Sequence, residues 1–336
     1  MTVEPLDPAT ADPADLTAFY ELRLAATRLS RPDAPDQRRF EFDRWVAAPD
    51  PHWPVLFRVV RRDGTVVGAS CVSLPEEDNR DSVFHWSWVH PDQRRRGVGT
   101  ELLADAVELG RAGGRQLITT EIWNGGAGAA FAERYGLAVA RRETLSRWDL
   151  STVDRGFLAA TAAADHPGYR LAHWRRTVPQ EWVEAFAAAQ DGMDDAPKDE
   201  LQLEEPAHSA ERVRAVERFI DARHEQMRHT VAIHQPSGEV AGLSTVILPL
   251  EPNGRAYQEN TAVVRAHRGH GLGLWMKADM ALRLLAEHPE VDHIVTGNAT
   301  SNEHMLRINT RLGFRPTEYA EGRQAPLDDV AKLLGG

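Results

Sequence analysis

The sequence predicts an α/β (α+β) fold in two tandem domains, each a mixed β-sheet flanked by helices. One local pattern occurs twice: a strand-like run, a basic turn, two glycines spaced two apart, then an amphipathic helix. The glycines are Gly97 and Gly99 in one copy and Gly271 and Gly273 in the other, so the copies lie 174 residues apart. A chain of 336 residues suits two domains better than one. We place them at 1–155 and 169–336, joined by a linker at 156–168.

In the first half, strand and helix patterns alternate, and turn residues mark the boundaries. Asp12 and Pro13 are typical of a helix start. The Asp-Gly pair at 63–64 joins two β-branched runs, as in a tight hairpin. Behind the first glycine pair, apolar residues recur with the period of a helix. We expect helices at 16–24, 98–109 and 127–134, and strands at 55–61, 66–73, 83–89 and 117–122.

The second half repeats this order. The residues Gln-Pro-Ser-Gly at 235–238 mark a hairpin turn, and Gly313 is placed to end the last helix. Between the halves, an alanine-rich stretch before Gly168 predicts a connecting helix, and the acidic stretch 191–205 predicts a loop. We expect helices at 183–189, 272–285 and 302–312, and strands at 231–234, 240–248, 258–264 and 293–296.

Composition indicates a globular, cytoplasmic protein. Hydrophobic residues make up 42% and charged residues 26% of the chain, and no apolar run has the length of a membrane span. The acidic, proline-rich start differs from a secretory signal peptide. A single cysteine, Cys71, excludes an internal disulfide and fits a reducing compartment. The net charge of −11 argues against general nucleic-acid binding, so we expect neither nucleic acid nor membrane as a partner.

The two basic glycine loops are suited to a phosphate. Glycines let backbone N–H groups approach an anion, the helix N-terminus adds its dipole, and Arg94 or Arg268 adds a fork of donors. A P-loop would need Lys-Ser or Lys-Thr after the last glycine, and a dinucleotide fingerprint would need a third glycine three residues on. Neither is present, which leaves the pattern Arg-x-x-Gly-x-Gly. The alternative is that each glycine pair only marks a helix start.

At these residues the chain resembles the GNAT superfamily of acyl-CoA-dependent N-acyltransferases, whose loop of this pattern binds the pyrophosphate of coenzyme A. A second block supports the resemblance. The last helix of the family commonly reads Asn-x-x-Ala, an aliphatic-Tyr pair and Leu-Gly-Phe, and residues 302–314 match it with Asn309 in place of tyrosine. In the first half only Tyr135-Gly136-Leu137 of this block is kept. The two-domain plan is similar to tandem acetyltransferases of the mycothiol synthase type.

The resemblance implies splayed sheets and acetyl-CoA (coenzyme A) as the cofactor. The acetyl-CoA contacts are expected on both loops and on the strands and helices beside them. In the first half these residues are Val89, Arg94, Arg95, Arg96, Gly97, Val98, Gly99 and Thr100. In the second half they are Val263, Val264, Arg268, Gly269, His270, Gly271, Leu272, Gly273, Asn298 and Asn302.

Acyl transfer from a thioester to an amine requires a neutral amine, which a nearby base can provide. We assign catalytic roles to Glu259, as the base on the strand before the second loop, and to Asn309. His85 lies 174 residues before Glu259 and is the corresponding candidate if the first half is active. Each could instead be an ordinary strand residue. A thiol with a pKa of about 8.5 leaves without a strong acid, and water or a different side chain could reprotonate the sulfur.

We therefore expect an N-acetyltransferase that moves an acetyl group from acetyl-CoA to an amine of a small molecule, as a monomer or homodimer. The second domain is expected to carry the chemistry. The rival is a catalytically silent coenzyme A-binding sensor or scaffold, which the missing tyrosine in both halves favours. His224 and His229 lie five residues apart, not the four that put two ligands on one helix face, so no metal site is expected.

Overall fold

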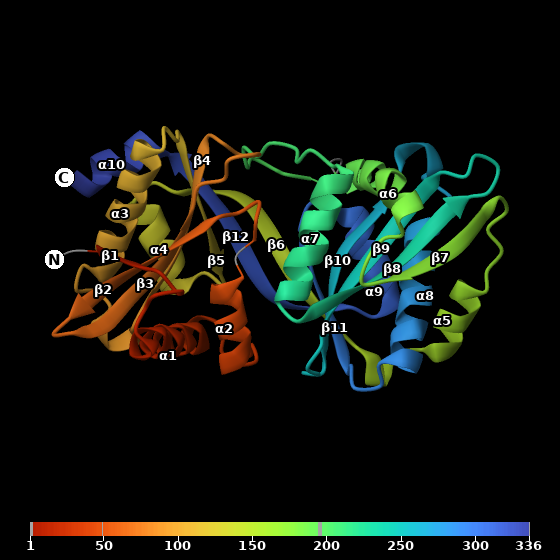
Figure 1. The fold of residues 1–336 in the computed structure, drawn as a ribbon, viewed down its shortest axis with the longest axis horizontal. Coiled ribbons are helices and arrows are strands. Elements are labelled where there is room, and N and C mark those ends of the chain that lie inside the picture. Colours follow the sequence, from red (N-terminus) through yellow and green to blue (C-terminus); the bar gives the residue numbers. More distant parts are fainter. Residues whose placement is uncertain (1–2, 49, 194–196, 336) are drawn as a thin grey trace. The chain divides into compact units, whose positions relative to one another are not determined.

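The computed structural model describes residues 3–48, 50–193 and 197–335. It divides the chain into two compact units, each with a β-sheet and helices packed on it (Figure 1). Unit 1 comprises Met1–Glu143, Lys198–Glu204 and Glu318–Gly336, and unit 2 comprises Thr144–Pro197 and Glu205–Thr317. None of the described helices is long and apolar enough to cross a membrane.

Unit 1 contains the first glycine loop. Its strands follow the order β1-β2-β3-β4-β5-β12. The strands are β1 (Val3–Leu6), β2 (Val55–Arg62), β3 (Thr65–Ser73), β4 (Ser82–Val89), β5 (Leu117–Trp123) and part of β12 (Arg315–Pro326). The helices are α1 (Pro13–Ser30), α2 (Arg39–Ala47), α3 (Val98–Ala112), α4 (Gly126–Arg134) and α10 (Leu327–Gly335).

Unit 2 contains the second glycine loop. Its strands follow the order β6-β11-β10-β9-β8-β7. The strands are part of β6 (Ala138–Asp149), β7 (Tyr169–Arg175), β8 (Glu225–His234), β9 (Val240–Pro249), β10 (Arg255–Val263) and β11 (His293–Ala299). The helices are α5 (Arg155–Ala162), α6 (Val183–Gln190), α7 (Ala210–Ala222), α8 (Leu272–Glu287) and α9 (Glu303–Leu312).

Two strands, β6 and β12, contribute residues to both units. In unit 1, residues 320–326 of β12 pair with β5 in antiparallel fashion, although they come from the end of the chain. In unit 2, the neighbour of β11 is β6, which comes from the first half of the sequence. Each strand is 12 residues long, about twice the common strand length, and so can serve two units. The units are therefore not the contiguous stretches 1–155 and 169–336.

The predicted fold class is confirmed, and each strand and helix expected from the sequence is present. Asp12 caps α1 by accepting a hydrogen bond from the Ala14 N–H at 2.8 Å. Asp63 and Gly64 have φ values of 50° and 78°, which a tight hairpin turn requires at both central positions. The expectations omitted seven helices and strands: α2, α7, α10, β1, β6, β7 and β12.

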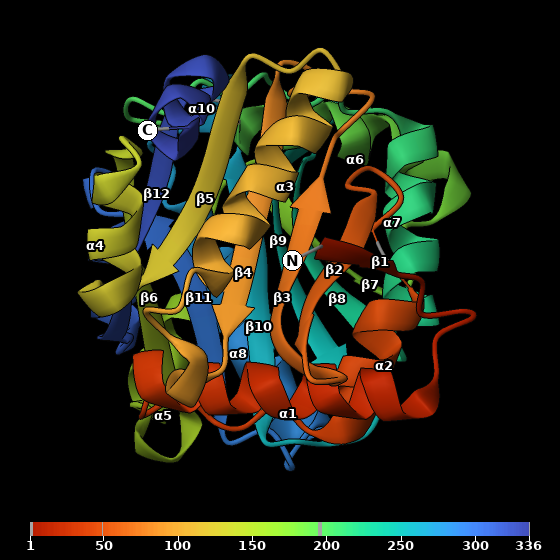
Figure 2. The ribbon, with the colours of Figure 1, turned by 90° about the vertical axis from the view of Figure 1, so that its left-hand side faces the viewer.

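In both units the parallel strands beside the loop pair only briefly and then diverge. In unit 1, β4 and β5 pair over residues 82–84 and 117–119 (Figure 2). In unit 2, β10 and β11 pair over residues 255–257 and 293–295. Because each glycine loop follows β4 or β10, the diverging strands lead directly to the loop. This is the splayed arrangement that the resemblance implied.

Candidate active site

The second loop places two left-handed residues before α8. Gly269 has φ 84° and Gly271, the N-cap of α8, has φ 72°. A Cβ on Gly269 would meet nothing within 4 Å, so backbone conformation and not crowding favours glycine there. Gly273 lies in the first helical turn, where a Cβ would be 3.6 Å from Ile308 of α9. The exposed loop thus presents backbone N–H groups at a helix N-terminus, as anion binding requires.

The first loop has the same backbone. Gly97, the N-cap of α3, has φ 86°, and Arg95 has φ 63° where the second loop has Gly269. A positive φ is uncommon for arginine. The first loop thus keeps the left-handed backbone conformation at this position although the residue is not glycine. Arg95 and Arg96 are exposed, Arg94 is half-buried, and the buried Val98 opens α3. Both loops therefore have the conformation expected of a phosphate cradle.

The predicted residues at the ends of the two strands play supporting roles. Val89 ends β4 and Val263 ends β10, both half-buried. The Val264 N–H donates to the Ala241 carbonyl at 3.0 Å, and the Arg268 Nε donates to the Val263 carbonyl at 3.1 Å. The loop is thus tied back to the strand, and the Arg268 side chain lies on the exposed side.

Histidines from two segments, the linker and the loop itself, lie at the base of the second loop. His166, in the predicted linker, stacks on Trp275 at 4.1 Å, and its Nδ1 lies 3.0 Å from the His270 carbonyl oxygen. His267 is buried, and its Nδ1 lies 3.1 Å from the Tyr169 hydroxyl. His270 itself is exposed, and Leu272 is buried at the start of α8. The linker therefore packs beside the loop, a contact that sequence spacing did not indicate.

Ligand-type atoms of His234, Glu239 and His267 converge within 4.8 Å of one another. Neither His224 nor His229 belongs to this cluster. His229 is buried, its Nδ1 is 2.9 Å from the Thr245 hydroxyl, and burial lowers its pKa to about 4. The expectation of no metal site stays a prediction.

The two candidate bases occupy different environments. Glu259 is exposed and lies in a register shift of β10 between Gln258 and Thr261. Such a bulge re-aims side chains and is common beside active sites. His85 lies in regular register opposite Val72, is 4% exposed, and has a pKa lowered by burial to about 4. His85 is therefore a neutral ring enclosed in a regular part of the sheet, whereas the Glu259 carboxylate is open to solvent.

Asn309 is the centre of a buried polar chain. The Lys277 ammonium of α8 donates to Asn309 Oδ1 at 2.8 Å, and Asn309 Nδ2 donates to Asn298 Oδ1 at 2.7 Å. Lys277 is 3% and Asn309 2% exposed. The Lys277 Nζ also lies 5.2 Å from the centre of the Phe314 ring. Sequence reasoning named both asparagines but missed Lys277, although a lysine on an apolar helix face was a visible signal.

Asn302 has a structural role in addition to the predicted one. Its side-chain oxygen accepts a hydrogen bond from the Met305 N–H at 3.1 Å and so caps α9. In unit 1, the Thr100 and Tyr135 hydroxyls lie 2.9 Å apart, and Gly99 is packed near Phe131. These contacts fix α4 against the start of α3.

Glu121 is a second residue that sequence reasoning missed. It lies on β5, two residues past the last pair with β4. Burial, with repulsion from Glu143, raises the pKa of its carboxyl to about 7. A carboxyl with such a pKa can exchange protons near neutral pH. Unit 1 therefore has a titratable group near its own diverging strands.

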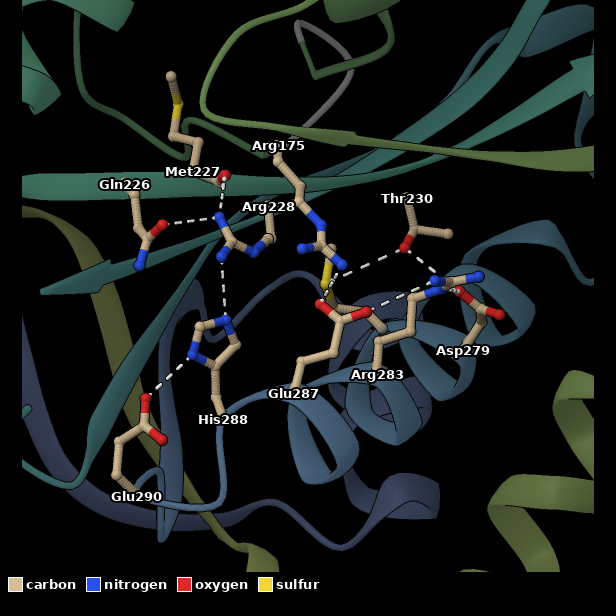
Figure 3. A network of polar contacts seen from close by, with 11 residues as sticks. Arg175, Gln226, Met227, Arg228, Thr230, Asp279, Arg283, Glu287, His288 and Glu290 are labelled. Atoms are coloured by element: carbon tan, nitrogen blue, oxygen red, sulfur yellow. Dashed lines mark hydrogen bonds and ion pairs between the residues drawn. The ribbon is translucent and has the colours of Figure 1, made fainter. Parts of the chain in front are cut away.

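A polar network holds α8 against its sheet (Figure 3). Asp279 accepts from Arg283 at 3.1 Å and from the Thr230 hydroxyl at 3.4 Å, and also pairs with His173 at 2.7 Å. Further along α8, Glu287 pairs with Arg175 at 2.9 Å. These contacts fix the helix that carries both the second loop and Lys277.

The structure thus brings the site residues predicted in the second half into one region. The loop connects β10 to α8, and Asn298 and Asn309 form a hydrogen-bonded group with Lys277 of that helix. Whether these residues bind a cofactor or act in catalysis stays a prediction. The sequence profile of the Acetyltransferase (GNAT) family matches residues 16–137. No curated protein matches the chain significantly.

Solved structures match over nearly the whole chain. A tandem GNAT protein from the clavulanic acid biosynthesis pathway, solved without acetyl-CoA, is 28% identical, with a TM-score of 0.80 over 97% of this chain and 98% of that one. A GCN5-related N-acetyltransferase from Sphaerobacter thermophilus has a TM-score of 0.71 over 97% and 95% of the two chains, at 16% identity. The latter likeness shows a shared fold alone. Residues 16–137 thus match the GNAT acetyltransferase family, and the whole chain has the fold of a tandem two-domain GNAT protein.

Proposed function

We propose that the protein transfers an acetyl group from acetyl-CoA to an amine of a small molecule, and that unit 2 carries the reaction. The observation that carries the proposal is the second loop: two left-handed glycines open α8 where β10 and β11 have diverged. The coenzyme pyrophosphate would bind the loop N–H groups, and the pantetheine arm would follow the diverging strands. The family match of unit 1 supports acyl transfer in general.

Residues of unit 2 supply the groups that the reaction needs. Glu259 would take the proton of the attacking amine, because its exposed carboxylate lies in the bulge of β10. The C–S bond then breaks and the electron pair leaves on sulfur. The rival function is a catalytically silent coenzyme A sensor. Asn309 favours it, because a side-chain amide does not act as an acid that could protonate the sulfur.

The binding part of the proposal is tested with Gly271→Val. A β-branched residue at φ 72° is strained and displaces the loop N–H groups, so calorimetry should show at least a tenfold loss of acetyl-CoA affinity at this site. Gly64→Val is the matched control. Gly64 also has a positive φ, 78°, with open space around it, but it lies in a hairpin turn outside the loop. Unchanged affinity in a folded Gly271→Val protein would refute the assignment of the loop.

The enzyme and the sensor are separated by thiol release from acetyl-CoA across a panel of small amines. The proposal expects turnover with at least one acceptor. Tight acetyl-CoA binding without acceptor-dependent thiol release across the panel would instead favour the sensor.

A further inference from the structure

We propose that the Lys277 ammonium gives a proton to the departing coenzyme A thiolate, and that Asn309 and Asn298 position it. The inference rests on the proposed function for its place in a reaction. It concerns a buried cation on the helix that opens with the second loop. The residues come from three elements, α8, α9 and β11, which the two hydrogen bonds connect.

The position of Lys277 on α8 is the first argument. It lies six residues after Gly271, which corresponds to roughly 9 Å along the helix axis. Asn298 lies on β11 three residues beyond Val295, the last residue paired with β10. A coenzyme whose pyrophosphate rests on the loop and whose arm enters between these strands would therefore bring its sulfur toward this group.

The hydrogen bonds among Lys277, Asn309 and Asn298 show which group donates and which accepts. Asn309 Nδ2 donates to Asn298, which fixes Asn309 Oδ1 as the acceptor for Lys277. Among the described residues, Asn309 is the hydrogen-bond partner found for the ammonium, which has three N–H donors. Up to two donors thus stay available for a ligand or water. Asn309 has no proton to relay and acts as a positioning residue.

Burial of this lysine is costly, which argues against a merely structural role. A charged group in an apolar interior destabilises the fold unless it is paired, and no charged neighbour contributes to its pKa shift. Burial alone lowers the pKa of Lys277 to about 7. The residue 174 positions earlier, Leu103, is buried in the corresponding helix of unit 1. An apolar residue is therefore compatible with this helix position, and the lysine demands another explanation.

The proposed step balances in atoms and charge. The amine nitrogen forms a bond to the acetyl carbon, and the C–S bond breaks. The electron pair of the C–S bond stays on sulfur and forms a new S–H bond with a Lys277 proton. The pair of the broken N–H bond stays on Nζ, which leaves a neutral amine. Glu259 has meanwhile taken a proton from the attacking nitrogen, and exchange with solvent restores both groups.

Within the described part of the chain, the side chains found in contact with the Lys277 ammonium are uncharged. They are Asn309 on α9 and the Phe314 ring beyond it. On its own helix, the nearest titratable group is Asp279, which is bonded to His173, Thr230 and Arg283. A pH effect that disappears with Lys277 is therefore expected to arise from its ammonium.

The experiment measures the thiol pKa of coenzyme A bound to the folded protein, followed by the ultraviolet absorbance of the thiolate. In the wild type, the neighbouring cation should lower this pKa by at least one unit from that of free coenzyme A measured under the same conditions. Lys277→Met keeps an unbranched chain of similar length, and Asn309→Leu removes the positioning amide. Both variants should lose the shift, whereas Lys332→Met, at an exposed lysine, should keep it.

The two proposals fail in different ways. Equal thiol pKa values in the wild type and Lys277→Met, with coenzyme A bound to both, would overturn the role of Lys277 whether or not the protein turns over. A lysine-dependent shift without any amine-dependent turnover would support Lys277 but refute the proposed enzyme. With turnover, Lys277→Met should lower kcat about 10²-fold at unchanged KM for acetyl-CoA and remove the loss of activity above neutral pH.

Discussion

The helices behind the two glycine loops share a scaffold but differ in one buried residue. Both begin at a left-handed glycine, Gly97 or Gly271, and both carry an aspartate at the same position. Asp105 pairs with Arg58 at 2.6 Å, and Asp279 pairs with His173 at 2.7 Å. Leu103 of α3, however, corresponds to Lys277 of α8. The loops thus share a backbone geometry, while a buried residue behind them differs between the halves.

The strands that precede the two loops also differ, in the register of their pairing with the neighbouring strand. β10 has a register shift that contains Glu259, whereas β4 keeps regular register at His85. The family profile nevertheless matches the first half. We interpret this as a match to the apolar and glycine positions that build the fold, since His85 is buried in the sheet. The predictions below test this difference between the halves.

The largest effect is expected from comparing the two loops by mutation. Gly271→Val should reduce turnover to the background rate, because unit 2 is proposed to bind the reacting coenzyme. Gly97→Val should leave turnover largely intact, since unit 1 is proposed to be structural or coenzyme-binding. Thiol release by both variants, at matched stability, checks this. If Gly97→Val is the more damaging variant, the roles of the halves must be reversed.

The second prediction concerns the base. Glu259→Gln keeps the shape but removes the proton acceptor, so kcat should fall by about 10²-fold. Raising the pH should relieve part of the loss, because more of the acceptor amine is then neutral. The exposed Glu181 provides the control Glu181→Gln, which should behave as wild type. A wild-type rate and pH profile from Glu259→Gln would remove Glu259 from the mechanism.

The third prediction is that unit 2 loses stability by carrying Lys277. Because the pKa is lowered from 10.5 to about 7, the unfolded chain binds more protons in this window, and wild-type stability should rise with pH across it. Lys277→Met should be more stable by about 2 kcal/mol at or below pH 7, with a smaller gain toward pH 10.5. Denaturant unfolding at several pH values checks this. A less stable variant would indicate a structural role.

The smallest effect is expected at Glu121 of unit 1. Its raised pKa means that the folded state binds more protons between pH 4.5 and about 7, so this contribution to stability is lost as the pH rises through that window. Glu121→Gln should remove the pH dependence and stabilise the protein by about 1 kcal/mol above pH 7. Turnover should be unchanged. A large loss of turnover would assign a catalytic function to unit 1.

The sequence predicted the elements with strong local signals. The hairpin at Asp63 and Gly64 and the helices behind the glycine loops follow from turn residues and apolar period. The exchange of β6 and β12 between units could not be predicted, because pairing between distant segments leaves no local pattern. The Lys277–Asn309 bond was missed for the same reason, since 32 residues separate the partners. The cap role of Asn302 follows a local rule and could have been found.

The most direct measurement is a crystal structure of the protein with coenzyme A bound at full occupancy. The account predicts the pyrophosphate on the N–H groups of residues 269–273 and the sulfur within hydrogen-bond reach of the Lys277 ammonium. Coenzyme A bound only at the first loop, with its sulfur nearer His85 or Glu121 than Lys277, would contradict the assignment of the chemistry to unit 2.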